Sequence, residues 1–330
     1  MQNFIILNQE EVESMLDMEQ VMAAVEDAYR YKCDYRAELF PLVTHSFKDG
    51  WEEFDIKSGS ADGAGVFGMK LVSAFTGNSD IGLPRLTGTI LLFERKTGML
   101  RSMMDGGSIT NMRTGAAGGI GCRLLARQES ETLLLVGTGA QGLPLIESAL
   151  IAMDNIKDIK VYNAHSYERV AAFAQRTKAR FGIDCPVEAV SSLEEACRMS
   201  DIILTATPSR EALIKEEWVR PGTHLSCIGS DMEGKQELEE TLVAKAHVFC
   251  DDRDQVVAVG ECEKAVRQGL LQPSAITEIG DVLLGNAPGR QSPSDITIFD
   301  STGIGLQDLM TAAMLTEQAE KNGLGTKMKL

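Results

Sequence analysis

The stretch Glu131–Met153, ETLLLVGTGAQGLPLIESALIAM, decides the fold of much of this chain. Its apolar run 133–136 predicts a strand, and the glycine-rich turn 137–142 follows at once. Apolar residues then recur at helical spacing up to residue 153. Strand, glycine turn and helix in this order are typical of a dinucleotide-binding unit, although a strand–turn–helix without a ligand has the same outline.

Each glycine of the turn has a distinct expected role. Gly137 permits the tight turn, Gly139 lets the backbone approach a pyrophosphate, and Gly142 lets the helix pack closely on the strand. The free N–H groups at the start of the helix would bind the phosphates. A second predicted strand, 159–162, ends at Asn163, near the place where such units carry their ribose-binding residue. The sequence therefore predicts a dinucleotide site.

The composition excludes several classes of function. The chain has 330 residues, 44% of them hydrophobic, and a formal net charge of -16, which argues against nucleic acid or an anionic membrane as a partner. The sequence predicts neither a signal peptide nor a membrane span. Its 7 cysteines and 4 histidines show no metal-ligand spacing, so we expect no metal and a reducing, cytoplasmic location.

The chain before the glycine turn has a different character. Residues 8–36 show a helical stripe, and residues 40–105 read as a mostly antiparallel β region. Ser108 or Thr110 could cap a helix that runs to Arg127. That helix is rich in glycine, which is costly in a helix, so we expect close packing there against another helix or a ligand.

From residue 131 onward, strands and helices alternate, which predicts an α/β fold with a doubly wound parallel sheet. The predicted strands are 133–136, 159–162, 201–205, 223–228, 247–250 and 296–299, and the predicted helices are 141–153, 166–181, 192–199, 236–245, 254–269 and 307–321.

Ligands of such sheets lie beyond the carboxyl ends of the strands. Asp231 follows one of these strands and could act as a general acid/base or, alternatively, as the N-cap of the helix expected near residue 236. An amino or imino acid also needs cations for its carboxylate, and Lys70 and Arg113 are the natural candidates.

Several short stretches together resemble the ornithine cyclodeaminase/mu-crystallin family over nearly the whole chain. They are Gly68-Met-Lys70, Gly82-Leu-Pro84 with Gly88, Thr97-Gly98, Thr110-Asn-Met-Arg113-Thr114-Gly-Ala-Ala117, Val136-Gly-Thr-Gly-Ala-Gln-Gly142, Pro221-Gly-Thr-His224, Gly229-Ser-Asp231-Met-Glu-Gly-Lys235-Gln-Glu237-Leu238 and Phe299-Asp-Ser-Thr-Gly303.

The resemblance implies a Rossmann domain, 121–303, inserted in an α+β substrate-binding and dimerisation domain, 1–120 and 304–330. It implies a homodimer, a nicotinamide cofactor and a small amino or imino acid substrate. Asp231 and Lys70 would be catalytic, and the substrate would be bound by Lys70, Arg113, His45 and Glu53. The residues expected at the cofactor are Thr89, Arg113, Gly137, Gly139, Ala140, Gln141, Asn163, His165, Thr205, Thr207, Gly229, Lys235 and Ser301.

Two departures from the family pattern bear on specificity. Val43 stands where many members carry a carboxylate-binding arginine, and His45 is the nearest basic residue after it. The side-chain pocket is expected among residues 40–60. Asn163 stands where NAD sites carry a carboxylate, which removes the repulsion of a 2′-phosphate and slightly favours NADP over NAD.

Three functions remain open. The first is an NAD(P)-dependent oxidoreductase, either an amino acid dehydrogenase or an imino acid reductase. The second is a cyclodeaminase, in which the hydride returns to the product and a further carboxylate, Glu53 or Asp55, positions a distal amine. The third is a non-catalytic protein that binds a small ligand, for which Lys70, Arg113 and Asp231 would not all be needed.

Overall fold

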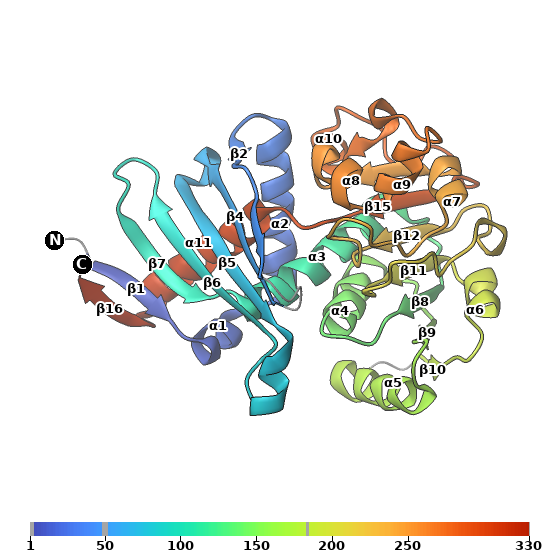
Figure 1. The fold of residues 1–330 in the computed structure, drawn as a ribbon, viewed down its shortest axis with the longest axis horizontal. Coiled ribbons are helices and arrows are strands. Elements are labelled where there is room, and N and C mark those ends of the chain that lie inside the picture. The colour runs from blue at the N-terminus through green and yellow to red at the C-terminus, as the bar shows by residue number, and fades with distance from the viewer. Residues whose placement is uncertain (1–2, 48–51, 183–184, 330) are drawn as a thin grey trace. The chain divides into compact units, whose positions relative to one another are not determined.

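A computed structural model describes residues 3–47, 52–182 and 185–329. The chain forms two compact units (Figure 1). The first unit is Met1–Arg113 with Ile304–Leu330, and the second is Thr114–Gly303. The division falls inside helix α3 (Gly107–Leu125), which also contains residue 120, the boundary expected from the sequence.

The first unit is built on one sheet, in the order β16-β1-β7-β6-β5-β4-β2, with β3 paired to β4. Strands β4 to β7 are antiparallel neighbours, which confirms the predicted β region. The strands are β1 (Asn3–Leu7), β2 (Ala37–Leu39), β3 (Val43–Ser46), β4 (Glu52–Ala61), β5 (Val66–Phe75), β6 (Leu86–Glu94), β7 (Leu100–Asp105) and β16 (Thr326–Lys329).

Helix α11 (Gly305–Asn322) covers β4, β5 and β6 and packs on α2 (Met18–Cys33) (Figure 1). The approach is close, since a Cβ placed on Gly68 would lie 3.0 Å from Leu309 Cδ2. The single helix expected over 8–36 is wrong, because α1 (Gln9–Met15) ends before α2 begins. Asp17 causes the break, since its side chain caps α2 by accepting from the Gln20 N–H at 3.1 Å.

The second unit is a parallel sheet in the order β10-β9-β8-β11-β12-β15-β13-β14, which confirms the predicted doubly wound fold. The chain order reverses between β8 and β11, where such sheets bind their ligands. The strands are β8 (Thr132–Val136), β9 (Asp158–Tyr162), β10 (Val187–Ala189), β11 (Ile202–Thr205), β12 (His224–Cys227), β13 (His247–Cys250), β14 (Thr277–Glu278) and β15 (Thr297–Asp300).

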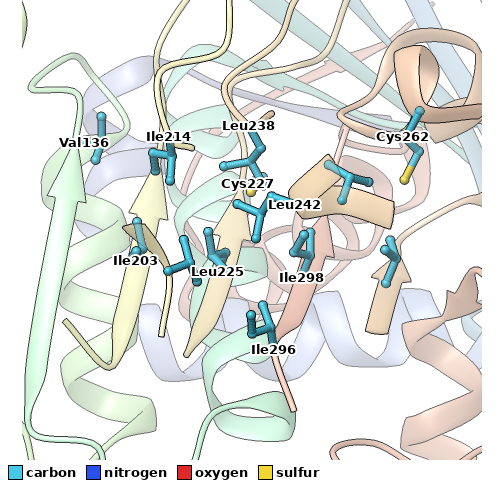
Figure 2. Packing of buried hydrophobic residues seen from close by; sticks show 14 of the residues in the cluster. Val136, Ile203, Ile214, Leu225, Cys227, Leu238, Leu242, Cys262, Ile296 and Ile298 are labelled. Atoms are coloured by element: carbon cyan, nitrogen blue, oxygen red, sulfur yellow. The ribbon is translucent and has the colours of Figure 1, made fainter. Parts of the chain in front are cut away.

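Apolar side chains from β11, β12 and β15 pack with those of α7 and α9 to form a core of this unit (Figure 2). The helices are α4 (Gly142–Ala152), α5 (Tyr167–Phe181), α6 (Leu193–Met199), α7 (Glu240–Lys245), α8 (Arg253–Val259), α9 (Cys262–Arg267) and α10 (Ile279–Leu284). The single helix expected over 254–269 is therefore two, separated at Gly260-Glu261. The helix expected from residue 236 begins at Glu240.

The glycines of α3 pack against helix α4, as the helix–helix alternative predicted. A Cβ on Gly115 would lie 2.4 Å from Pro144 Cβ, and one on Gly119 would lie 2.6 Å from Ser148 Cβ. The expected caps of α3 are wrong, because the Asp105 carboxylate accepts from the N–H of Ser108 at 2.9 Å. Across the described ranges, no helix combines the length and the apolarity that a membrane span requires.

Short 3-10 turns also occur in the two units. They are η1 (Asp62–Ala64), η2 (Thr76–Ile81), η3 (Glu216–Trp218) and η4 (Pro273–Ala275).

Candidate active site

The glycine turn after β8 has the geometry that a phosphate-binding turn needs. Gly137 has φ 113°, and a Cβ there would lie 2.5 Å from the carbonyl oxygen of Ala206, so only glycine fits. A Cβ on Gly142 would lie 2.7 Å from the Phe173 ring. Among the described residues, its chain neighbours aside, no atom lies within 4 Å of a Cβ built on Gly139. This open space allows a pyrophosphate to lie against the backbone.

A cavity of about 330 Å³ lies beside this turn at the carboxyl end of β9. The Asn163 amide donates to Thr138 Oγ1 at 3.1 Å, and its oxygen accepts from the His165 N–H at 2.9 Å. The residues that line the cavity are Thr138, Gly139, Asn163, His165, Arg169, Ala172 and Arg176. Among the described residues, two arginines and no acidic residue line it, so the cavity suits an anionic group.

Sequence reasoning missed Arg176 at this cavity. Arg176 follows Arg169 by seven residues on α5, which is two helical turns and therefore the same face of the helix. That spacing was visible in the sequence, but it gains meaning only once α5 is known to border the cavity.

Buried Glu237 draws together three of the predicted cofactor residues. Its carboxylate accepts from Thr205 Oγ1 at 2.7 Å, from the Thr207 N–H at 2.7 Å and from the Gly229 N–H at 2.9 Å. The Thr205 side chain is fully buried with its hydroxyl on Glu237. Thr205 ends β11, Thr207 follows that strand and Gly229 follows β12, so Glu237 fixes the carboxyl ends of two neighbouring strands.

Asp231 and Lys235 form an ion pair on the loop after β12. The Asp231 side chain is 46% exposed, and that of Lys235 is 16% exposed. The alternative role of Asp231 as a helix cap is wrong, because the N-cap of α7 is Glu239. Asp231 therefore presents an accessible carboxylate that no helix end requires.

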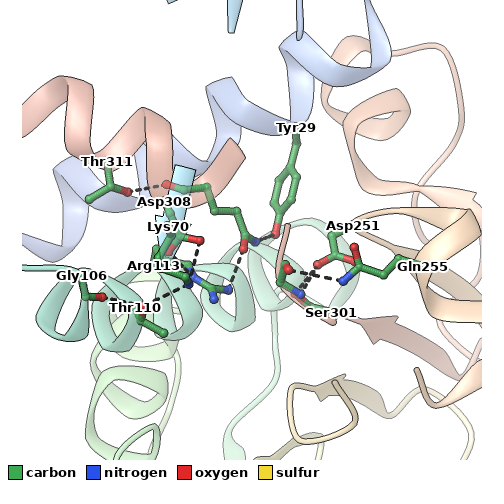
Figure 3. A network of polar contacts seen from close by, with 12 residues as sticks. Tyr29, Lys70, Gly106, Thr110, Arg113, Asp251, Gln255, Ser301, Asp308 and Thr311 are labelled. Carbon is green, nitrogen blue, oxygen red and sulfur yellow. Dashed lines mark hydrogen bonds and ion pairs between the residues drawn. The ribbon is translucent and has the colours of Figure 1, made fainter. Parts of the chain in front are cut away.

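Ser301 follows β15 and donates its hydroxyl to Asp251 Oδ2 at 2.9 Å (Figure 3). The same oxygen accepts from the Gly303 N–H at 2.7 Å. Asp251 thus holds the segment that follows the strand, with Ser301 almost fully buried in it.

In the first unit, Lys70 and Arg113 converge on the carboxylate of Asp308 (Figure 3). Lys70 Nζ lies 2.8 Å from Asp308 Oδ2, and Arg113 Nε lies 3.1 Å from Oδ1. All three side chains are buried, with exposed fractions of 2%, 6% and 0%. Two cations thus share one anion, which leaves one positive charge in excess in this set.

Neighbouring side chains fix the orientation of both cations. Arg113 Nη1 donates to Gln307 Oε1 at 2.8 Å, and the Gln307 amide donates to the Tyr29 hydroxyl oxygen at 2.5 Å. Lys70 Nζ donates to Thr110 Oγ1 at 3.1 Å. Sequence reasoning missed Tyr29, Gln307 and Asp308, since no local pattern indicates a contact between residues so far apart in the chain.

The electrostatic state of this set follows from its burial. Burial lowers the pKa of Lys70 to about 7, and the nearby charge of Arg113 adds to the shift while Asp308 opposes it. Burial also disfavours ionised Asp308, but the charges of Arg113 and Lys70 outweigh that effect and hold its pKa below the usual value. Lys70 therefore titrates near neutrality while Asp308 stays ionised.

The strand register shows which other predicted residues share a face with Lys70. Lys70 pairs with Lys57, and Glu53 lies on β4 at an even spacing from Lys57, so Glu53 faces the same side of the sheet. His45 pairs with Phe54, and Thr89 pairs with Leu71, which places both on the opposite side. The structure brings Glu53, but not His45 or Thr89, to the face of Lys70. Within the pocket expected over 40–60, residues 48–51 lie outside the described residues.

Comparisons with known proteins agree with this architecture. The alanine dehydrogenase of Archaeoglobus fulgidus is 37% identical over 326 residues, which cover 98% of each chain. The solved structure of an archaeal alanine dehydrogenase dimer with bound NAD matches with a TM-score of 0.93 and 35% identity, covering 100% of both chains. The iminosuccinate reductase of Paracoccus denitrificans, solved with NAD+, matches with a TM-score of 0.94 and 29% identity, again covering 100% of both chains.

The model of one protein family matches residues 2–323, almost the whole chain. That match spans both units and includes the glycine turn, the Lys70–Arg113 pair and Asp231. The chain belongs to the ornithine cyclodeaminase/mu-crystallin family.

Proposed function

We propose that this chain is an NAD(P)-dependent oxidoreductase that transfers a hydride at the α-carbon of a small amino or imino acid. The observation that carries the proposal is the buried set of Lys70, Arg113 and Asp308, with its one excess positive charge. A buried excess charge is costly unless an anion neutralises it. One carboxylate, the group common to all α-amino and α-imino acids, neutralises it.

The second unit supplies the residues that would hold a dinucleotide. The Gly137–Gly142 turn and the start of α4 suit a pyrophosphate, and the open space at Gly139 supports this assignment. The nicotinamide supplies the group that accepts or donates the hydride. Two relatives described above were solved with NAD or NAD+, which supports a nicotinamide dinucleotide here.

In this proposal the protein's own residues orient the substrate and move a proton. Lys70 and Arg113 bind the carboxylate, which fixes the orientation of the α-carbon. Asp231 accepts or donates the proton on the substrate nitrogen, a role that its accessible carboxylate allows. Lys235, paired with Asp231, helps to fix the position of that carboxylate.

We assign NADP as the preferred cofactor, on the strength of the cavity beside Asn163. A carboxylate at this place would repel a 2′-phosphate, whereas Arg169 and Arg176 offer it two cations. Replacing Arg176 with Ala should raise the Kd for NADPH at least ~10-fold while leaving the Kd for NADH within about twofold. Arg180→Ala is the matched control, because Arg180 lies on the same helix but contacts Glu147. Equal losses for both dinucleotides would contradict the assignment.

A cyclodeaminase is the second candidate, and one observation favours it. Asp55 and Glu53 lie on the face of the sheet that carries Lys70, and Asp55 Oδ1 is buried without a hydrogen-bond partner in the described part of the chain. A distal ammonium group of a diamino acid could bind that oxygen. The lyase would use the same hydride transfer, with the hydride returned to a cyclic product.

One assay with two readouts separates these functions. The purified protein would receive a panel of L-amino acids, including alanine, ornithine and lysine, with NAD or NADP. Reduced cofactor that accumulates in step with ammonia identifies a dehydrogenase. Ammonia without net reduced cofactor identifies a cyclodeaminase. Silence in this direction and in the reverse direction, with cyclic imines or 2-oxo acids plus amines, would leave a binding protein and refute the proposal.

We also propose a homodimer in the cytoplasm. The support for the dimer is the archaeal alanine dehydrogenase, which was solved as a dimer. The support for a reducing compartment is the odd and dispersed set of seven cysteines in the sequence. Light scattering on the purified protein, which measures its molar mass, tests the dimer.

A further inference from the structure

The loop that carries Asp231 and Lys235, residues 229–238, contains no helix or strand. We call it the Asp231 loop. It connects β12 to α7, and a single bridge from Leu238 to Ile214 is its only strand-like pairing among the described residues. A catalytic carboxylate on an irregular loop needs other contacts to hold it in a productive position.

Glu261, the residue that precedes helix α9, supplies the first of these contacts. Its Oε1 accepts from the Ser230 hydroxyl and from the Glu237 N–H, the latter at 2.7 Å. Its Oε2 accepts from the Leu238 N–H at 3.0 Å. Through these bonds Glu261 contacts both ends of the Asp231 loop, including Ser230, the residue directly before Asp231. The Glu261 side chain is buried.

Helix α9 itself supplies further contacts along the middle of the loop. Glu263 Oε2 accepts from the Gly234 N–H at 2.9 Å, and Arg267 Nη2 donates to Glu233 Oε1 at 2.9 Å. The Lys264 ammonium donates to the side chain of Gln236. Asp231 and Lys235 have no contact of this kind with α9 in the described structure, so their side chains remain available to a ligand.

The helix is itself anchored in the core of its unit. The Asp300 carboxylate accepts from the Cys262 N–H at 3.1 Å, and the Cys262 side chain is buried in the apolar cluster with Leu238 and Leu242 (Figure 2). A Cβ on Gly260 would lie 2.6 Å from Asp300 Oδ2, so the chain approaches that carboxylate closely. Helix α9 therefore offers a fixed surface for the loop.

We propose that Glu261 and Glu263 are positioning residues, which hold the Asp231 loop on helix α9 and so determine where Asp231 meets the substrate nitrogen. This inference rests on the proposed role of Asp231. In the described structure, neither glutamate touches the glycine turn or the cavity beside Asn163. The loss of Glu263 should act on turnover rather than on dinucleotide binding, whereas the loss of Glu261 also frees the N–H of Glu237, which holds Thr205, Thr207 and Gly229.

The three contacts require two acceptor oxygens at residue 261. Glu261 accepts three hydrogen bonds with two oxygens, whereas glutamine presents one oxygen and one amino group that only donates. Glu261→Gln therefore leaves at least one N–H or O–H of the loop facing another donor. The volume of the side chain is unchanged, so the loop shifts without a cavity being created.

The test is a double-mutant cycle of Glu261→Gln with Asp231→Asn, measured in the reaction that the panel identifies. Glu261→Gln alone should lower kcat by about 10- to 100-fold, since a displacement near 1 Å can cost about 100-fold in rate. The Kd of the dinucleotide should change less than about threefold in Glu263→Ala, which leaves the bond between Glu261 and Glu237 in place. Glu261→Gln introduced into the Asp231→Asn variant should lower kcat by less than about a further twofold. The reason is that both substitutions act through the carboxylate of Asp231.

Gln268→Ala is the matched control. Gln268 follows α9 directly and contacts Glu240 rather than the Asp231 loop, so this variant should keep normal kcat. The number of dinucleotide-binding sites per chain is a further readout. Partial unfolding would lower this number together with kcat, whereas a displaced Asp231 lowers kcat while every site still binds the dinucleotide.

The outcomes distinguish a failure of the proposed role of Asp231 from a failure of the positioning role of Glu261 and Glu263. Normal turnover of Asp231→Asn would refute the proposed role of Asp231. A large loss in Asp231→Asn with normal turnover in Glu261→Gln would refute the positioning role, and so would losses that multiply in the double variant. Where Glu261→Gln fails to fold, Glu263→Ala carries the test alone, because it removes the contact to Gly234 and should show the same non-additivity.

Discussion

The titration of Lys70 predicts how substrate affinity depends on pH. Its pKa, lowered to about 7 by burial and by the charge of Arg113, lies far below the ordinary lysine value. Below pH 7, Lys70 and Arg113 carry two positive charges against the one negative charge of Asp308. Above pH 7, Lys70 is neutral, and the positive charge of Arg113 and the negative charge of Asp308 cancel. Raising the pH therefore removes the charge that we propose binds the carboxylate.

The size of the effect follows from the pKa. Each pH unit well above 7 lowers the protonated fraction of Lys70 about tenfold, so affinity for a carboxylate should fall about 50-fold between pH 7 and pH 9. Below pH 6 the affinity should no longer depend on pH through this group.

The inhibition constant of propionate, measured between pH 6 and pH 9, isolates this effect. Propionate has a carboxylate and no amine, so neither Asp231 nor a substrate nitrogen contributes to the titration. Lys70→Met should bind propionate weakly at every pH and show no slope. Lys57→Met, on the strand position opposite Lys70, removes a charge that lowers the pKa of Lys70, so it should move the slope to higher pH without abolishing it. A pH-independent inhibition constant, or normal affinity in Lys70→Met, would refute the reasoning.

Three further predictions concern single residues. Asp231→Asn should lower kcat at least ~100-fold and leave the Kd of the dinucleotide unchanged, as steady-state kinetics and fluorescence titration of the reduced dinucleotide would show; an equal loss of dinucleotide affinity would contradict the assignment. Gly139→Ala should keep the Tm, because the space at its Cβ is open, but should weaken dinucleotide binding in that space. Gly137→Ala should lower the Tm, because φ is 113° and the carbonyl oxygen of Ala206 blocks the Cβ. Calorimetry with and without dinucleotide separates the two effects. Asp308→Asn should destabilise the protein by about 3–5 kcal/mol at pH 6, because both buried cations lose their counter-ion. The loss should be smaller at pH 9, where Lys70 is neutral. Urea unfolding at both pH values measures the free energy of unfolding, and an equal loss at both would contradict the charge count.

The sequence predicted the elements whose signals are local. The alternation of strands and helices after residue 131 identified the parallel sheet, and short apolar stretches bounded by turns within residues 40–105 identified the antiparallel one. Local signals also misled, since the helical stripe of residues 8–36 continues through Asp17, which caps a second helix. A cap and a surface position on one long helix have the same sequence pattern.

Contacts between distant residues could not be predicted from one sequence. Asp308 lies more than 190 residues after Arg113, and nothing near it in the chain indicates that it faces two cations. The face on which His45 lies depends on the register of β3 against β4, and a shift of one residue would reverse it. Glu261 is likewise unremarkable in the sequence, because its role depends on how α9 packs on the Asp231 loop.

The transfer of deuterium tests the reaction at the α-carbon most directly. An L-amino acid that is active in the panel would be supplied with deuterium at its α-carbon, together with the oxidised dinucleotide, and the cofactor would be examined by mass spectrometry. We expect one deuterium in each reduced dinucleotide, in an amount equal to the ammonia released. Reduced dinucleotide without deuterium would contradict hydride transfer from the α-carbon, and deuterium found only in a cyclic amino acid would assign the cyclodeaminase reaction instead.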